Sequence, residues 1–274
     1  MDGFALMFAL NRTIQYYIEI THPKKMLYMI YEEGKCMNNK TTFHIKVIVL
    51  IILILSAVFA HADDNWDLIK DSEGIQVLNK NVAGSEIKEF KATAIIDAPI
   101  EVIFEVMADV PAESLWMDSC IESKIIKNID KFVISKDNYY SKDLVYNAIS
   151  ATFPVANRDF IVETEMRGYL KKRSININIR AVIDSGIPVR EGYVRITELT
   201  GSWFFQYIDR NHTSVVYQIN QNPGGNLPSS IVNYINKNMP YKTILGLREI
   251  TKNEKYIKLA KNGVYGNGPL QYLH

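Results

Sequence analysis

Few residues of this chain have the types and spacing that catalysis requires. The 274 residues include 5 histidines and 2 cysteines, and after residue 62 only His212, His274 and Cys120 remain. No cluster has zinc-ligand spacing, and no G-x-S-x-G elbow or phosphate-binding loop occurs. Cys120, with so few histidines available, is better explained as an inert thiol than as a nucleophile. The sequence therefore predicts no catalytic residue, no metal and no cofactor.

The adjacent pair Arg158 and Asp159 is a candidate of another kind. Neighbouring residues of a strand face opposite sides, so one of the two can point inward. A buried charge without a partner is costly. Arg158 could orient the polar end of a ligand, or the pair could lock a loop through salt bridges and backbone contacts. The second interpretation is favoured, because ion pairs serve architecture more often than chemistry.

Large apolar side chains are candidates for a pocket wall, since binding pockets are mostly apolar with a few polar anchors. The aromatic candidates are Trp116, Tyr146, Trp203 and Tyr217. Strand parity places Trp203 and Phe205 on one face and Phe204 on the other. Ordinary core packing explains each aromatic equally well, although Trp116 lies in a connection, not in a periodic element. On the last predicted helix the candidates are Val232, Ile235 and Met239.

An N-terminal targeting segment is predicted ahead of the domain. Residues 47–60 form an uncharged apolar run of 14 residues, with two lysines just before it and an Ala-His-Ala sequence at its end. These features are typical of a secretory signal peptide, and the run is shorter than the roughly 20 residues that cross a bilayer. We assign 37–62 to the signal peptide and leave 1–36 as an unassigned leader or an over-long start. An uncleaved membrane anchor is the alternative.

The remaining residues are long enough for one domain with a sizeable core and short for two. They hold 25 Lys and Arg against 26 Asp and Glu, and this balance argues against a nucleic-acid binder driven by phosphate neutralisation. With Cys120 as their one cysteine they form no internal disulfide, which fits a bacterial periplasm better than an animal extracellular space. We expect a domain at 63–260 and a tail at 261–274.

Short strand-like segments with turn signals dominate the domain. A short helix or turn is expected at 66–71, and a helix is expected to begin at Pro99, where apolar residues follow at helical spacing. The predicted strands cover 75–81, 86–96, 121–129, 139–148, 160–166, 174–183, 193–207 and 213–220. Consecutive strands with short turns predict an antiparallel meander. Alternating strand–helix units are not apparent, which argues against a parallel nucleotide-binding sheet.

A polar turn rich in Gly and Pro at 222–229 leads into an amphipathic helix that ends near Ile250. Pro240 lies inside the apolar pattern, where a proline removes one backbone hydrogen bond and kinks the axis. We therefore expect a bent helix or two helices in line. The predicted fold class is α+β, with a curved antiparallel sheet that grips a long C-terminal helix and can leave a hollow between them.

Five segments in order carry a resemblance to a known family. They are Trp66 with Gly74-Ile75-Gln76-Val77, Trp116-Met117-Asp118, the stretch 120–123, the stretch 154–160 with its Arg-Asp-Phe, and the turn and helix start at 222–233. Together they resemble the START lipid-transfer domain family, in the form of an exported bacterial member. The resemblance covers roughly residues 64–259.

The resemblance implies a helix-grip fold whose tunnel holds one sterol, phospholipid or similar molecule, with the C-terminal helix and nearby loops opening as a lid. Some family members place an acid–arginine pair in the tunnel. The matching positions here fall near Val145 and Thr164, so the pair is missing, which argues against a sterol-type ligand and against a specific contact to a polar head group.

We predict a monomeric, non-enzymatic protein of the bacterial periplasm that binds, and can transfer, a lipid or other hydrophobic molecule. Transient membrane contact is expected, and nucleic acid is not a partner. One alternative is a cyclase- or hydrolase-like enzyme on the same fold, which requires a polar constellation that points into the cavity. The other is an interaction module whose core is solid and whose surface carries the function.

Overall fold

The computed structural model describes residues 66–134, 138–151, 154–169 and 171–262. The predicted signal peptide at 37–62, the unassigned residues 1–36 and most of the predicted tail lie outside the described residues. The strands are β1 (Asp67–Ser72), β2 (Ile75–Val82), β3 (Ser85–Ile96), β4 (Cys120–Ile134), β5 (Asn138–Ile149), β6 (Asn157–Tyr169), β7 (Ser174–Ala181), β8 (Tyr193–Arg195), β9 (Glu198–Asp209) and β10 (His212–Asn222). The helices are α4 (Ile100–Ala108), the 3-10 helix η1 (Val110–Leu115), α5 (Ser229–Asn236), α6 (Met239–Ile250) and α7 (Glu254–Asn262).

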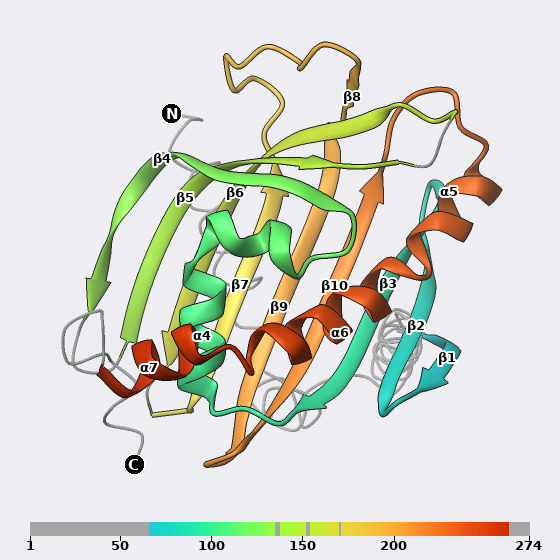
Figure 1. Ribbon diagram of the computed structural model, residues 1–274. Coiled ribbons are helices and arrows are strands. Elements are labelled where there is room, and N and C mark those ends of the chain that lie inside the picture. Colours follow the sequence, from blue (N-terminus) through green and yellow to red (C-terminus); the bar gives the residue numbers. More distant parts are fainter. Residues whose placement is uncertain (1–65, 135–137, 152–153, 170, 263–274) are drawn as a thin grey trace, which may run out of the picture. The chain divides into compact units, whose positions relative to one another are not determined.

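One sheet contains all the described strands, in the order β1-β2-β3-β10-β9-β7-β6-β5-β4, with β8 added beside β6. The described pairings are antiparallel except that of β8 with β6, which is parallel. Figure 1 shows α4, η1 and the C-terminal helices lying over one face of this sheet. The predicted α+β helix-grip fold is confirmed.

Side-chain alternation decides which face of each strand meets the helices. On β10, Val215, Tyr217 and Ile219 are buried, whereas the residues between them are partly exposed. On β9, Phe205 is buried and Phe204 is 40% exposed, as strand parity predicts. The buried residues of adjacent strands share one face and form the core with the inward faces of α4 and α6.

The helix that begins after Pro99 is also confirmed as α4. Proline fixes its own φ near the helical value and is tolerated at the start of a helix because the N–H that it lacks would have no intrahelical partner there. Ile100, Ile103 and Phe104 are buried. Val102 and Val106 are buried as well, because η1 and α7 pack around α4 in addition to the sheet.

The strand order corrects the simple meander that the sequence suggested. β3 does not pair with β4; it pairs with β10, so an early described strand and the last described strand lie side by side. The chain passes from β3 through α4 and η1 to β4, at the opposite end of the described sheet. Pairing between strands so far apart in sequence depends on the whole curved sheet, and local turn signals do not report it.

Two expected elements were wrong in type or extent. Most of the residues at 66–71 belong to strand β1, which pairs with β2 through a turn at Glu73 and Gly74. Both turn residues have positive φ, 55° and 68°, as a two-residue hairpin turn requires. The single strand expected at 193–207 is divided into β8 and β9, because β8 pairs with β6 and β9 pairs with β7 and β10.

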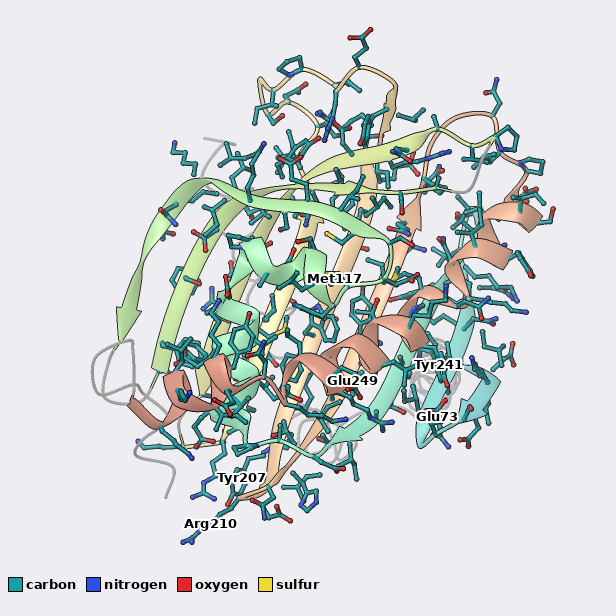
Figure 2. All side chains as sticks on the ribbon, in the orientation of Figure 1. Glu73, Met117, Tyr207, Arg210, Tyr241 and Glu249 are labelled. Atoms are coloured by element: carbon teal, nitrogen blue, oxygen red, sulfur yellow. The ribbon has the colours of Figure 1, made fainter. Side chains whose placement is uncertain are left out.

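The C-terminal helix was expected to be either one bent helix or two helices in line, and the structure has two helices in line, α5 and α6. Pro240 occupies the first turn of α6, where its missing N–H costs no hydrogen bond. A further helix, α7, was not predicted and extends to Asn262. Tyr241 Oη donates to Glu73 Oε1 at 2.6 Å, a contact that ties α6 to the β1–β2 turn (Figure 2).

Candidate ligand-binding site

A cavity of about 510 Å³ lies between the helical layer and the β4–β9 part of the sheet. Cavities of roughly 300–1,000 Å³ with mostly apolar walls are the usual form of small-molecule sites. Its apolar lining includes Met107 and Ala108 of α4, Val145 of β5, Val162 of β6 and Ile177 of β7. Met117, which is labelled in Figure 2, follows η1 and also borders the cavity. The core is therefore hollow beneath α4 and η1, which counts against the solid-core alternative.

One carboxyl group reaches this cavity from η1. Glu113 Oε2 accepts hydrogen bonds from Ser123 Oγ at 2.7 Å and from Asn147 Nδ2 at 2.8 Å. Both bonds end on Oε2, so Glu113 Oε1 has no protein partner among the described residues. Burial raises the pKa of Glu113, and the bonds from Ser123 and Asn147 offset this only in part. The half-buried Glu113 side chain thus borders the cavity with one carboxyl oxygen that is open to a ligand.

Most of the other polar lining residues lie farther along β4 and β5, and Thr164 lies on β6. Asn128 Nδ2 donates to Asp143 Oδ1 at 2.7 Å, and Tyr140 Oη donates to Asp130 Oδ2 at 3.5 Å. Asn128 and Asp130 are exposed and also border the cavity, so they mark its open end. The described lining residues include three acids, Glu113, Asp130 and Asp143, and no lysine, arginine or histidine.

Of the predicted site residues, Trp203 is the one in the described lining of the cavity. Its ring stacks on Tyr217 with centroids 4.0 Å apart, and the ring of Trp116 meets it edge-on at 6.0 Å. Trp116 and Tyr217 are both buried. They therefore pack against Trp203 in an aromatic cluster and do not themselves border the cavity.

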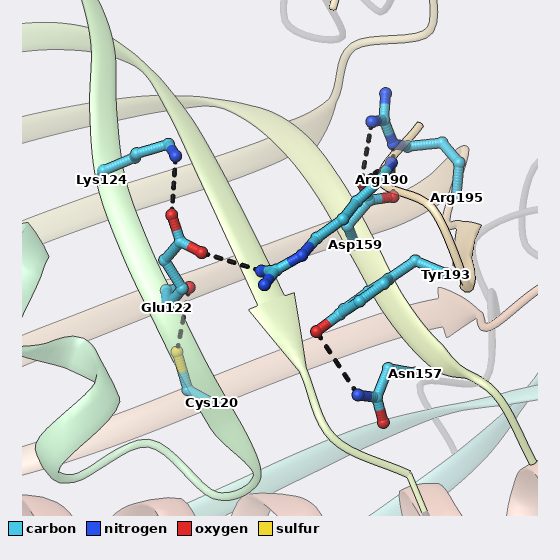
Figure 3. A network of polar contacts seen from close by, with 8 residues as sticks. All are labelled: Cys120, Glu122, Lys124, Asn157, Asp159, Arg190, Tyr193 and Arg195. Atoms are coloured by element: carbon cyan, nitrogen blue, oxygen red, sulfur yellow. Dashed lines mark hydrogen bonds and ion pairs between the residues drawn. The ribbon is translucent and has the colours of Figure 1, made fainter. Parts of the chain in front are cut away.

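Tyr146 lies on the other face of the sheet. Its neighbour Val145 borders the cavity, so alternation turns Tyr146 outward, where it packs with Ala148 and Ile161 in a separate small cluster. The segment before β8 covers this cluster. Lys124 Nζ lies over the Tyr146 ring at 4.8 Å, and Arg190 bridges the covering segment to Glu122 at 3.0 Å, as Figure 3 shows.

Arg158 is buried at the start of β6 and does not belong to the described cavity lining. Its Nε donates to the carbonyl of Pro223 at 3.1 Å and its Nη2 to the carbonyl of Gly224 at 3.4 Å. A third bond joins Nη1 to the carbonyl of Ala156. These contacts hold the turn that precedes α5, which fits the structural interpretation of the Arg158 and Asp159 pair.

The predicted residues of the last helix also stand outside the described lining. Val232 is buried, whereas Ile235 is 49% exposed. Met239 Sδ accepts a hydrogen bond from Tyr217 Oη at 3.7 Å. Contact between a ligand and Val232, Ile235 or Met239 stays a prediction.

Sequence reasoning missed Glu113 and the residues that hold it. Ser123 is a small polar residue in a strand and Asn147 is another, and nothing in their spacing links them to an acid in the preceding connection. Val145 and Thr164 do border the cavity, and they are the positions to which the resemblance had assigned the missing acid–arginine pair.

Cys120 is predicted to be unreactive, and its surroundings give the reason. Burial and the negative charge of Glu113 raise the pKa of the Cys120 thiol to about 11. At pH 8 only about one molecule in a thousand is then a thiolate, the reactive form. In a Cys36→Ser variant, we expect a chromogenic disulfide reagent to label the native protein far more slowly than the protein in denaturant. Equal labelling rates at pH 8 would show that the thiol is not protected.

The described residues contain no group of three or more His, Cys, Asp or Glu side chains arranged to hold a metal ion. They define a class of domain: a helix-grip fold with a mostly apolar cavity that three acidic side chains, Glu113 among them, border. A family model fits this class. The START domain model matches residues 54–254, and the chain belongs to the START domain family.

Relatives from bacteria and animals agree with this assignment. The chain is 28% identical over 207 residues to an uncharacterized protein of Pseudomonas aeruginosa, a match that covers 73% of this chain and 96% of that protein. It is 23% identical over 183 residues to the human phosphatidylcholine transfer protein, covering 65% and 80% of the two chains.

Solved structures show the same fold. A STAR-related lipid transfer protein fragment from Xanthomonas axonopodis is 30% identical, with a TM-score of 0.58, and the match covers 69% of this chain and 100% of that fragment. Human StAR-related lipid transfer protein 5 is 15% identical with a TM-score of 0.60, over 76% and 96% of the two chains. The similarity to the human protein, at 15% identity, is evidence for the fold alone.

Proposed function

We propose that this protein binds one lipid or other hydrophobic small molecule in the cavity beneath α4 and η1, and that it exchanges the molecule with apolar surfaces. The observation that carries the proposal is the apolar cavity of about 510 Å³ in a START-family domain. Each 100 Å² of apolar ligand surface that leaves water contributes about 2.5 kcal/mol to binding. Relatives that are named as lipid transfer proteins support the proposal.

A substitution that fills the cavity tests this directly. Val145 is 2% exposed and borders the cavity, so phenylalanine there takes up space that a ligand needs. We expect Val145→Phe to weaken the binding of the apolar dye Nile red at least tenfold, measured by fluorescence titration. Overpacking also costs about 1–3 kcal/mol of stability, so a thermal melt accompanies each titration.

Val216→Phe is the matched control, because Val216 lies on the other face of β10. It should leave the dye affinity within twofold of the parent. A folded Val145→Phe protein with unchanged dye affinity would contradict binding in this cavity.

The C-terminal helices gate the cavity by holding its cover in place. Asp109, at the end of α4, contacts two residues of α7. It accepts a hydrogen bond from Tyr256 Oη at 3.0 Å and forms an ion pair with Lys255. The backbone N–H of Asp118, after η1, donates to Thr243 Oγ1 of α6 at 3.4 Å. Release of α6 and α7 would thus free α4 and η1 together, and this is the motion that ligand exchange requires.

The domain acts as an exported monomer that touches a membrane only to load or release its ligand. This part of the proposal rests on the targeting pattern at 37–62. Among the described residues, no helix is both long and apolar enough to span a bilayer.

An enzymatic function would be favoured by acids bonded to one another, or by an acid bonded to tyrosine or histidine, inside the cavity. One acid–tyrosine bond is present at the exposed open end, where Tyr140 Oη donates to Asp130 Oδ2 at 3.5 Å, but Tyr140 is not among the described lining residues. The carboxyl group of Glu113 bonds instead to a serine and an asparagine within the described part of the chain. We therefore propose binding and not turnover.

A further inference from the structure

We infer that the cavity selects an uncharged amphiphile whose polar group is a hydroxyl or carboxamide, and that this group hydrogen-bonds to Glu113 Oε1. The inference rests on the proposed function, because it names the class of ligand that the same cavity takes. Three observations carry it: the open oxygen of Glu113, the charges of the lining, and the positions of the polar groups along the cavity.

The first observation is the geometry at Glu113. Ser123 and Asn147 fix the carboxyl by donating to Oε2 at 2.7 and 2.8 Å, and Oε1 is left to whatever enters the cavity. When a ligand fills the cavity and displaces water from Oε1, that oxygen costs free energy unless the ligand supplies a hydrogen bond. An ionised Oε1 accepts a hydrogen bond, and a protonated Oε1 donates one. A hydroxyl or carboxamide can do both, so it satisfies Glu113 in either protonation state.

The second observation is the sign of the charges. The described lining contains Glu113, Asp130 and Asp143 and no cationic side chain. A carboxylate or phosphate head group would enter with a negative charge and find no cation to compensate it, at a large desolvation cost. The lining therefore disfavours fatty acids and phospholipids relative to neutral amphiphiles of the same length.

The third observation is the separation of the polar ends. Ser123, which holds Glu113, and Asp130 at the open end lie on the same strand, β4, so they are roughly 20 Å apart at about 3.3 Å per residue. Apolar residues such as Ile125, Val162 and Ile177 line the cavity as well. This arrangement suits an elongated ligand whose polar group binds at Glu113 and whose chain extends toward the opening.

Binding of three ligands with one chain length separates the effect of charge from that of apolar surface. Displacement of Nile red from the full chain at pH 8 is measured with tetradecanol, tetradecanoate and tetradecylammonium. We expect tetradecanol to bind at least tenfold more tightly than tetradecanoate. Equal affinity for tetradecanol and tetradecanoate would overturn the inference, and so would tighter binding of tetradecylammonium than of tetradecanol.

Variants then assign the preference to Glu113. Glu113→Leu removes the hydrogen bond and should weaken tetradecanol binding about tenfold, and a thermal melt checks that the variant is folded. Glu113→Gln keeps the shape and removes the charge, so tetradecanoate should gain affinity. Glu249→Leu, at an exposed position of α6, should change neither ligand. Unchanged tetradecanol affinity in Glu113→Leu would overturn the assignment.

The same titrations keep the two proposals apart. If the parent chain binds Nile red and the three ligands without preference, the inference about Glu113 fails and the proposed function stands. If the parent binds none of them, both fail.

Discussion

Asp159→Asn should lower the free energy of unfolding by about 3–5 kcal/mol, the cost of breaking a buried ion pair by removing one charge. Asp159 is fully buried, and Arg195 grips it with two bonds, Nε to Oδ1 at 2.7 Å and Nη2 to Oδ2 at 2.9 Å. The backbone N–H of Arg190 adds a third bond at 3.2 Å. The loss leaves the guanidinium of Arg195, whose side chain is only 11% exposed, without its carboxylate. Urea unfolding followed by circular dichroism measures the change.

Asp97→Asn is the control, because the Asp97 side chain is 90% exposed, and it should change the free energy of unfolding by less than about 0.5 kcal/mol. Burial alone would raise the pKa of Asp159, but the bonds and charge of Arg195 outweigh it and hold the pKa below its ordinary value. The stabilisation is therefore complete above the unfolded-state pKa and is lost as pH falls through the folded-state pKa. Equal unfolding midpoints for Asp159→Asn and the parent would refute this role.

Gly246→Ala should destabilise the protein by about 1–3 kcal/mol through overpacking, although glycine to alanine inside a helix ordinarily stabilises by about 1 kcal/mol. A Cβ atom at Gly246 would lie 1.9 Å from the carbonyl oxygen of Trp116, so α6 must move away from the segment that follows η1. Because this segment belongs to the cavity cover, release of bound Nile red should become faster. Stopped-flow fluorescence measures the release and urea unfolding the stability.

Glu249→Ala, on the exposed side of the same helix, is the control for the substitution to alanine. It should leave both the release rate and the unfolding midpoint near those of the parent. A Gly246→Ala protein that is more stable than the parent would mean that the contact between α6 and Trp116 is not tight.

The face of each strand could be predicted from sequence because alternation is a local property. Ile175 and Ile177 are buried, and Asn178 between Ile177 and the next isoleucine is exposed, as the pattern indicates. Pro240 located the break between α5 and α6 for an equally local reason, its missing N–H.

Contacts between distant segments could not be predicted in the same way. The pairing of β3 with β10 brings Ala92 opposite Tyr217, and no nearby residue signals it. The carboxyl site has the same origin: Glu113, Ser123 and Asn147 come from η1, β4 and β5. Their meeting depends on how η1 lies across the sheet. Sequence therefore predicted an apolar cavity and not the acid that borders it.

The turn before α5 shows where motif and geometry agree. The Arg-Asp-Phe stretch was selected for its resemblance to a family. In the structure, both of its charged side chains form hydrogen bonds that hold loops in place. Arg158 fixes the turn at Pro223 and Gly224, and Asp159 fixes the segment before β8 through Arg195. Adjacent residues on one strand thus restrain two different connections, because their side chains point to opposite faces.

Native mass spectrometry of the full-length protein, expressed and purified without detergent, tests the central claim most directly. The account predicts a native mass that exceeds the denatured mass by one small hydrophobic molecule, which organic extraction recovers and which is absent from Val145→Phe. The denatured mass also reports whether the chain begins after residue 62. Identical native and denatured masses, in a protein that also refuses Nile red and tetradecanol, would contradict the account.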